Sequence, residues 1–337
     1  MANRFDQLIE QWDPVLRRAF LNGVSQIRDQ VTIKVIADLL ERGDIGGAVR
    51  TVALNSVSFR ALDAAILQAF EAGGVYTTDR IPALREPSGY RLRVQFDVRN
   101  LRAEEWLRAH SSTLISRIIE DQRIAIRQHL TAGMEAGQSP RAVALDLVGR
   151  VNRTTGRREG GVIGLTASQE EWVRRYAAEL ADPALLRNAL GRSLRDRRFD
   201  RSIMKALRDG TPLPADMQAR MVTAYRNRAL RYRAEVIART EAMTALHRSQ
   251  VEAFQQAIDA GQVNEQAVTK VWHSAADKRV RHTHQALHGQ SVGFKAEFVS
   301  PSGARLAYPG DSSAPASEII QCRCWMDIKI DFLAGIT

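Results

Sequence analysis

Cysteine is almost absent from the sequence: only Cys322 and Cys324 occur among 337 residues, one residue apart. A disulfide between them would close a very small, strained ring. Sparse and unbridged cysteine is typical of proteins kept in a reducing compartment. The two thiols are therefore expected to be free or to bind a metal ion.

Proline is also scarce, with 10 residues, while 45% of the residues are hydrophobic. This composition favours a folded chain over a disordered one. No apolar run approaches the length of a membrane-spanning helix, and residues 1–6 lack the apolar core of a signal peptide. We therefore expect a protein that is made and kept in a cytoplasm, with no membrane as a partner.

Acidic residues are fewer than basic residues. The sequence has 38 Asp and Glu and 48 Lys and Arg, which gives a formal charge of +10. Such an excess usually indicates a polyanionic partner, most often nucleic acid. The alternative is that the arginines simply solvate helix faces. The densest cluster, a candidate contact with nucleic acid or a protein partner, comprises Arg192, Arg195, Arg197, Arg198 and Arg201.

Apolar residues at helical spacing dominate the chain, so the predicted fold class is mainly α. Asp13-Pro14 predicts a helix boundary, because aspartate caps helices and proline suits their first turn. One long helix is predicted from beyond Pro214 to about Ala260. Between residues 90 and 98 apolar and polar residues alternate, which predicts a strand in a β-hairpin or arm.

Local capping signals predict two further helix starts, at Ser139-Pro140 and at Thr166, which forms a capping box with Gln169. The glycine- and arginine-rich segment 152–165 lacks the Gly-Lys-Ser/Thr ending of a phosphate-binding loop, so we expect a surface loop with a docking role. Residues 183–208 are predicted to be helical.

Three regions follow from these patterns. Residues 1–100 form an N-terminal helical region with the β arm, and residues 101–262 form a basic helical body. Residues 263–337 form a small α+β unit, called the cassette here.

The cassette concentrates the side chains that bind metals, since it holds both cysteines and four of the seven histidines. His284 and His288 lie one turn apart on a helix predicted from Asp277 to Gly289, and Cys322 and Cys324 face one side of a predicted closing strand. Packed together, they would form a tetrahedral zinc set, with His273 as a possible substitute ligand. The alternative is that the cysteines are small core residues and His284 is a hydrogen-bonded structural histidine.

A catalytic interpretation has less support. A zinc nuclease needs a carboxylate base beside its metal, and the candidates Asp277, Asp311 and Glu318 are scattered along the sequence. Neither a Gly-x-Ser-x-Gly elbow nor a His-Glu-x-x-His helix occurs. We therefore predict a protein that is not an enzyme. The alternative is a zinc-dependent nuclease or a toxin-like enzyme that uses the His/Cys cassette.

An ordered set of residues in the last third of the chain carries a family resemblance. The set comprises Arg239-Thr240-Glu241, Trp272, Asp277-Lys278-Arg279-Val280-Arg281, His284, Leu287, Gly289, Phe298, Pro309-Gly310-Asp311 and Cys322-Arg323-Cys324. It resembles the C-terminal region of the phage head morphogenesis family, the minor head proteins similar to the F protein of phage Mu. The resemblance covers about residues 100–330. The sequence departs from it at Gln321, where asparagine is expected.

The resemblance implies a low-copy minor capsid protein of a tailed phage, a structural protein in the virion, at the capsid interior or the portal vertex. It would be assembled in the host cytoplasm and act in head assembly, DNA packaging or ejection. The implied partners are the portal protein, the major capsid protein or scaffold, and packaged double-stranded DNA bound without sequence preference. The motif residues expected to have structural roles are Trp272, Asp277, Arg279, Arg281, Gly289, Pro309, Gly310 and Asp311.

Overall fold

The computed structural model of the chain describes residues 4–82, 84–85, 91–275 and 277–331. It divides into two compact units, each assembled from separated segments of the sequence. Unit 1 comprises residues 1–19, 62–113 and 235–337, and unit 2 comprises residues 20–61 and 114–234. Because these units combine distant segments, they do not test the three sequential regions predicted above, which stay a prediction.

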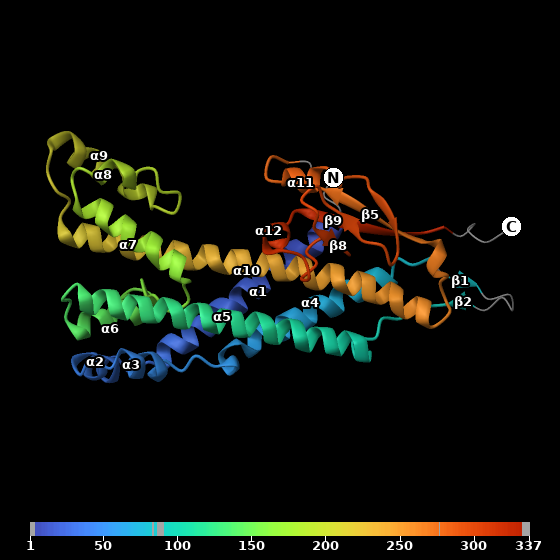
Figure 1. The fold of residues 1–337 in the computed structure, drawn as a ribbon, viewed down its shortest axis with the longest axis horizontal. Helices are drawn as coiled ribbons and strands as arrows, with labels where there is room; N and C mark the ends of the chain where they lie inside the picture. The colour runs from blue at the N-terminus through green and yellow to red at the C-terminus, as the bar shows by residue number, and fades with distance from the viewer. Residues whose placement is uncertain (1–3, 83, 86–90, 276, 332–337) are drawn as a thin grey trace. The chain divides into compact units, whose positions relative to one another are not determined.

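The fold class is mainly α, as predicted from the sequence (Figure 1). Four helices contribute residues to both units. These shared helices are α1 (Arg4–Gln30), α4 (Arg60–Thr78), α5 (Leu101–Glu135) and α10 (Ala215–Asp259). The bounds of α10 confirm the long helix expected between Pro214 and Ala260. None of the helices within the described ranges combines the length and hydropathy needed to cross a bilayer.

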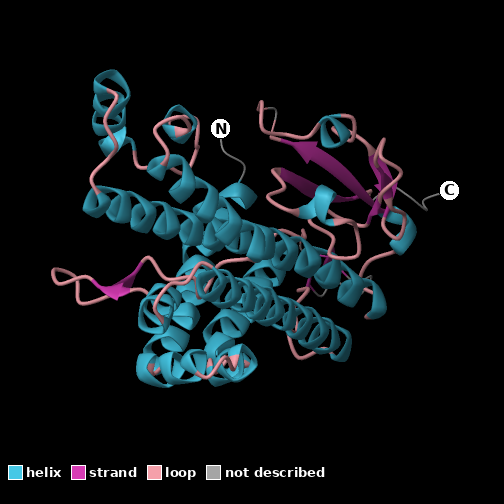
Figure 2. Cartoon of the chain, turned by 60° about the vertical axis from the view of Figure 1, so that its left-hand side comes forward, coloured by secondary structure: helices cyan, strands magenta, loops and turns pink. Residues whose placement is uncertain are grey.

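The remaining elements of unit 1 form the arm and the cassette. In Figure 2 the strands of the cassette sheet stand out against helices and loops. The elements are β1 (Leu84–Arg85), β2 (Arg91–Leu92), η3 (Glu265–Ala267), β5 (Val268–Ser274), α11 (His282–Gln285), β6 (Ser291–Gly293), β7 (Phe298–Val299), β8 (Arg305–Leu306), α12 (Ala316–Ile319) and β9 (Cys324–Ile330). The sheet is antiparallel with strand order β6-β5-β9, and β7 pairs with β8 in a separate hairpin.

Unit 2 is built from short helices and one small hairpin around its parts of α1, α5 and α10. Its remaining elements are α2 (Ile33–Glu41), α3 (Ile45–Thr51), η1 (Ser56–Phe59), α6 (Pro140–Val148), β3 (Arg150–Val151), β4 (Arg158–Glu159), α7 (Ala167–Ala181), α8 (Leu186–Ala189), η2 (Arg197–Phe199) and α9 (Asp200–Asp209). Ser139 caps α6, and Thr166 forms the predicted capping box of α7 with Gln169. Residues 183–208 were expected to be helical throughout, but loops separate α8, η2 and α9.

The helix boundary predicted at Asp13-Pro14 is wrong, because Pro14 lies inside α1. An interior proline removes one helical hydrogen bond. The helix continues because Ile9, Leu16 and Phe20 on its apolar face are completely buried. It ends instead at Gln30, and Thr32 adopts extended backbone as the N-cap of α2.

The strand predicted over residues 90–98 is also largely wrong. Tyr90 lies outside the described residues, and the described strand is limited to Arg91–Leu92, paired with Leu84–Arg85. The following residues dock on helices instead. Phe96 packs beside Phe70 with 5.7 Å between ring centroids, and the backbone of Asp97 exchanges two 2.9 Å hydrogen bonds with the Gln256 amide. The apolar positions of the alternating pattern therefore serve packing against helices rather than strand pairing.

The segment 152–165 is only partly the surface loop that was expected. Its first half forms the turn and the second strand of the β3–β4 hairpin, whereas Val162, Ile163 and Leu165 are completely buried in unit 2. Three arginines donate hydrogen bonds to carbonyl oxygens of this buried half: Arg28 to Gly161 and Ile163, Arg226 to Gly160, and Arg233 to Gly164. Part of the arginine content therefore stabilises the fold and is not available to a partner.

Candidate metal centre

The centre lies where β9 begins, at one end of the cassette sheet. Strand β9 pairs with β5 along its whole length, so Cys324 stands opposite Ser274. Cys322 precedes the strand rather than lying on it, but both thiols point toward His284. Both cysteines are buried.

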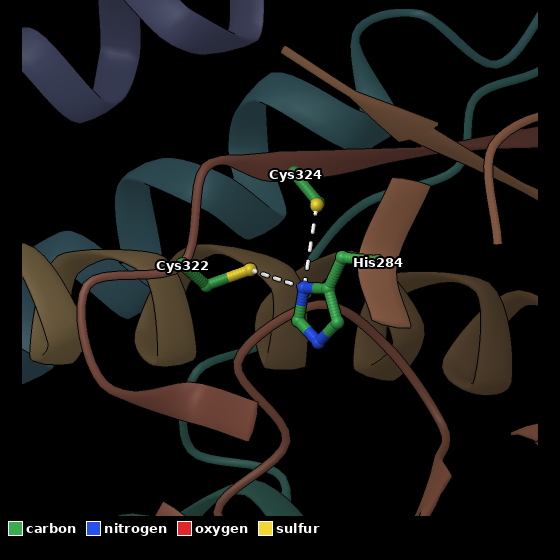
Figure 3. A group of neighbouring side chains, drawn as sticks. All are labelled: His284, Cys322 and Cys324. Carbon is green, nitrogen blue, oxygen red and sulfur yellow. Dashed lines mark hydrogen bonds between the residues drawn. The ribbon is translucent and has the colours of Figure 1, made fainter. Parts of the chain in front are cut away.

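His284 completes the cluster from α11. Its Nδ1 lies 3.4 Å from the Sγ of Cys322 and 3.4 Å from the Sγ of Cys324 (Figure 3). One ligand atom from each of the three residues falls within 4.8 Å of the others. The sequence-based convergence of two sulfurs and an imidazole is thus found in the geometry.

The structure does not bring the other two candidate histidines to this cluster. His288 Nδ1 accepts a 3.1 Å hydrogen bond from the Ser274 N–H, and His273 Nε2 lies 3.0 Å from a carboxylate oxygen of Asp327. The prediction that His284 and His288 share a helix face is wrong, because α11 ends at Gln285.

The predicted helix from Asp277 to Gly289 is shortened at both ends by competing hydrogen bonds. The Asp277 carboxylate accepts from the Arg279 N–H and lies 2.7 Å from Arg323, which fixes a turn before the helix. At the other end Gly289, with φ +80, donates its N–H to the Trp272 carbonyl. The sheet therefore uses backbone groups that a longer helix would have needed.

Glu318 is the residue of the centre whose role sequence reasoning missed. One carboxylate oxygen lies 2.8 Å from His284 Nε2 and accepts a hydrogen bond from the Thr283 hydroxyl, while the other accepts from the Ser302 hydroxyl at 2.7 Å. Burial alone would raise the pKa of Glu318, but the hydrogen bonds from Ser302 and Thr283 and the neighbouring His284 lower it below its ordinary value. A buried carboxylate is therefore held ionised behind the imidazole.

The pKa values of the two thiols shift in opposite directions because the thiols are hydrogen-bonded to each other. The hydrogen bond from Cys324 and the contact with His284 lower the pKa of Cys322 well below the usual thiol value, against the opposing effect of burial. The hydrogen bond with Cys322, followed by burial, raises the pKa of Cys324. The centre thus offers two sulfur atoms and an imidazole nitrogen, which is a donor set of a thiophilic metal site.

Comparison with known proteins found a family model that matches part of the chain. Residues 197–326 match the family model described as phage Mu protein F like protein. Residues 197–326 are called the F-like region here. It contains the complete candidate centre and most of the motif residues quoted from the sequence, while residues 100–196 lie outside the match. No curated protein and no solved structure matches the chain.

Motif residues of the F-like region join the cassette to α10 within unit 1. The Thr244 hydroxyl donates a 2.7 Å hydrogen bond to the carbonyl of Gly310, which adopts φ +82. Asp311 then accepts from the Ala307 N–H and from Ser313, which closes the Pro309-Gly310-Asp311 turn. This turn therefore docks the cassette on the helix.

Further motif residues hold the loops around the centre. Arg281 donates hydrogen bonds to the carbonyls of Glu318 and Ile320, and Arg279 lies 3.4 Å from Asp277. Trp272 is completely buried and meets His284 edge-on, with 5.2 Å between ring centroids. The structural roles expected for these residues stay a prediction.

Gln321, where the sequence departs from the family pattern, has a left-handed backbone with φ +53. Its N–H donates a 3.1 Å hydrogen bond to the Thr240 hydroxyl, so the turn links the centre to α10. Asparagine tolerates left-handed backbone better than most residues, which gives a physical reason for asparagine at this position.

Replacing Gln321 with asparagine is therefore expected to stabilise the protein by about 0.5 kcal/mol, because it relieves backbone strain at an exposed side chain. Urea denaturation followed by circular dichroism would measure the change. Gln290→Asn is the matched control, since Gln290 is exposed and does not have positive φ. Equal effects of the two substitutions would contradict the explanation.

The five arginines predicted as a contact surface fall into two groups, those with a carboxylate partner and those without one among the described residues. Arg192 pairs with Glu179, Arg195 with Asp200 and Arg198 with Asp196, so these three have internal carboxylate partners. Arg197 and Arg201 are exposed and form no ion pair with any described residue. The cluster is thus partly structural.

Unit 2 also contains a groove lined by arginines, which was not predicted from the sequence because its residues are far apart in the chain. A groove of about 970 Å³ is bordered by the β3–β4 hairpin, η2 and the first turns of α10. Five arginines line it against one aspartate and one glutamate: Arg150, Arg198, Arg220, Arg228 and Arg231. Arg220 and Arg231 are exposed and have no carboxylate partner among the described residues.

Proposed function

We propose that the chain is a non-enzymatic minor capsid protein of a tailed phage, placed at the capsid interior or the portal vertex. The observation that carries this proposal is the family match, which covers the long helix and the entire cassette core. Its partners would be the portal protein and the major capsid protein or scaffold. Its role would lie in head assembly, DNA packaging or ejection.

The burial of the candidate centre supports a structural role over catalysis. Cys322, His284 and Glu318 have the order of a nucleophile, a base and an orienting carboxylate. However, their exposed fractions are 0%, 1% and 4%, so no substrate could touch the sulfur unless the cassette opened. Metal-dependent cleavage of DNA by the purified protein, abolished by His284→Ala, would contradict the non-enzymatic proposal and favour the nuclease alternative.

The arginine-lined groove of unit 2 is the proposed contact with packaged DNA. Five arginines and two carboxylates line it, an excess of three positive charges. Two of these arginines, Arg220 and Arg231, are exposed and have no carboxylate partner in the described structure. Arginine binds phosphate oxygens through a planar pair of N–H groups. The helix face from Arg220 to Arg231 carries small and polar residues between them, which leaves the guanidinium groups accessible to a phosphate backbone.

Replacing Arg220 and Arg231 with glutamine is expected to weaken DNA binding and to reduce the slope of log K against log salt by about 2, since each phosphate contact contributes about 0.9. Fluorescence anisotropy with two unrelated duplexes over a salt series would measure the slope. The matched control replaces Arg117 and Arg127, two exposed arginines on α5, and removes the same charge. Equal slopes for the two double variants would mean that the groove is not the DNA contact.

Cross-linking mass spectrometry on purified procapsids tests the proposed position. Cross-links from lysines of the chain to the portal protein, or to the inner surface of the coat or scaffold, are expected. Cross-links to the outer capsid surface alone would contradict placement in the interior.

A further inference from the structure

We propose that His284, Cys322 and Cys324 bind one zinc ion, which holds α11 against the start of β9. The proposal concerns the stability of the cassette and does not depend on the proposed role in the phage head. His284 comes from α11 and the two cysteines come from the start of β9, so an ion would join two parts of the cassette that the sheet alone does not connect. Structural zinc sites stabilise small domains in this way.

The distances fit zinc. With Zn–S bonds of about 2.3 Å and Zn–N bonds of about 2.0–2.1 Å, tetrahedral geometry separates a sulfur from a nitrogen ligand by about 3.6 Å. The separation found from His284 Nδ1 is 3.4 Å to each of the two sulfurs. The two nitrogen–sulfur separations therefore need to change by only a few tenths of an ångström to accept the ion.

The hydrogen-bonding capacity of His284 also favours a cation. Nδ1 carries either one proton or one lone pair, so it cannot satisfy two buried sulfur atoms equally well. A cation placed among the three atoms interacts with all of them at once. Two thiolates would balance the charge of Zn²⁺, whereas a monovalent ion would leave a net negative charge in a buried site.

Glu318 would position the imidazole for this role. Its carboxylate lies behind the ring at Nε2, and metal-binding histidines characteristically donate their second ring N–H to such a group. The oxygen lies 2.8 Å from Nε2 but off the axis of the N–H, so a small rotation of the ring would complete the hydrogen bond. The proton would then reside on Nε2, which directs the Nδ1 lone pair to the metal.

Among the described residues no fourth side chain joins the cluster of ligand atoms. A tetrahedral ion would therefore complete its shell with a small ligand such as water. Glu318 lies on the far side of the imidazole and could not act as a base on that water. Three protein ligands with one open position also occur in catalytic zinc sites. Here the burial of all three ligands and the position of Glu318 favour a structural ion.

Elemental analysis of the full chain purified from zinc-supplemented cells tests the proposal. One zinc per chain is expected for the wild type, and almost none for Cys322→Ser or Cys324→Ser. His288→Ala is the matched control, because His288 belongs to the same cassette but faces Ser274, and it should keep its zinc. Glu318→Gln should keep the ion but bind it about 10–100-fold more weakly in a chelator competition.

The wild-type protein provides a readout that does not depend on whether the variants fold. A chelator should lower its melting temperature and make both thiols reactive to a thiol reagent, and added zinc should reverse both effects. X-ray absorption should show two sulfur ligands and two nitrogen or oxygen ligands. A wild-type protein that takes up no zinc and is indifferent to the chelator would overturn the proposal, as would uptake of copper(I) in preference to zinc.

Discussion

Replacing Trp272 with alanine is expected to lower the free energy of unfolding by about 3–5 kcal/mol, because it removes the largest completely buried side chain of the cassette. The indole contacts His284 and also lies edge-on to Phe298, with 5.1 Å between ring centroids. The cavity left by the substitution would therefore border the candidate metal centre as well as the apolar core. Urea denaturation followed by circular dichroism would measure the loss.

Trp172→Ala is the matched control for this experiment. Trp172 lies on α7 with 36% of its surface exposed, so its truncation creates no closed cavity. We expect a loss of about 1 kcal/mol or less for this variant. Equal losses for the two substitutions would contradict the assignment of Trp272 as the centre of cassette packing.

Replacing Glu170 with glutamine is expected to destabilise unit 2 by about 3–5 kcal/mol, because it leaves the charge of Arg226 without its buried partner. The Glu170 carboxylate is 3% exposed, lies 2.8 Å from Arg226 Nη2 and accepts a second contact from His129 at 3.1 Å. Arg226 in turn holds the carbonyl of Gly160, so the network supports the buried half of the segment 152–165.

The neighbouring Glu171→Gln is the control for that substitution. Glu171 pairs with Arg174 and Arg175 on the exposed face of α7, where ion pairs contribute about 1 kcal/mol or less. Thermal denaturation of both variants would compare them. A Glu170→Gln variant no less stable than Glu171→Gln would mean that the buried network contributes little to the fold.

The same network predicts a dependence of stability on pH. Burial would raise the pKa of Glu170, but Arg226 and His129 outweigh it and lower the pKa below the ordinary value of 4.5. A carboxyl whose pKa is lower in the folded state stabilises the fold fully above pH 4.5 and loses that contribution as the pH falls below 4.5. The loss of stability below pH 4.5 should therefore be smaller in Glu170→Gln than in the wild type.

Local signals in the sequence predicted the parts of the fold that depend on local interactions. The capping residues Ser139 and Thr166 lie at the starts of α6 and α7, and the long helix predicted from beyond Pro214 to about Ala260 agrees with α10 to within a few residues. The predictions failed where groups distant in the sequence form contacts that replace the expected local structure. Residues 93–97 have the alternation of a strand, but Gln256 on α10 binds the backbone of Asp97.

The candidate metal centre could likewise be predicted only as far as residue type and sequence spacing allow. His284, Cys322 and Cys324 could be proposed from residue type and spacing, because few other residues in the chain bind soft metals. Glu318 could not be assigned, since Thr283 and Ser302, which bind its carboxylate, lie 35 and 16 residues away along the chain. The helix containing His284 was overestimated for a related reason, because the backbone of Gly289 is bound by the sheet.

The most direct test of the proposed role is quantitative mass spectrometry of nuclease-treated virions and of procapsids collected from cells that carry the proposed phage genome with the gene for this chain. The account predicts peptides of the chain in both kinds of particle, at a copy number far below that of the major capsid protein. Abundant protein in the soluble fraction of infected cells, with none in either particle, would contradict it.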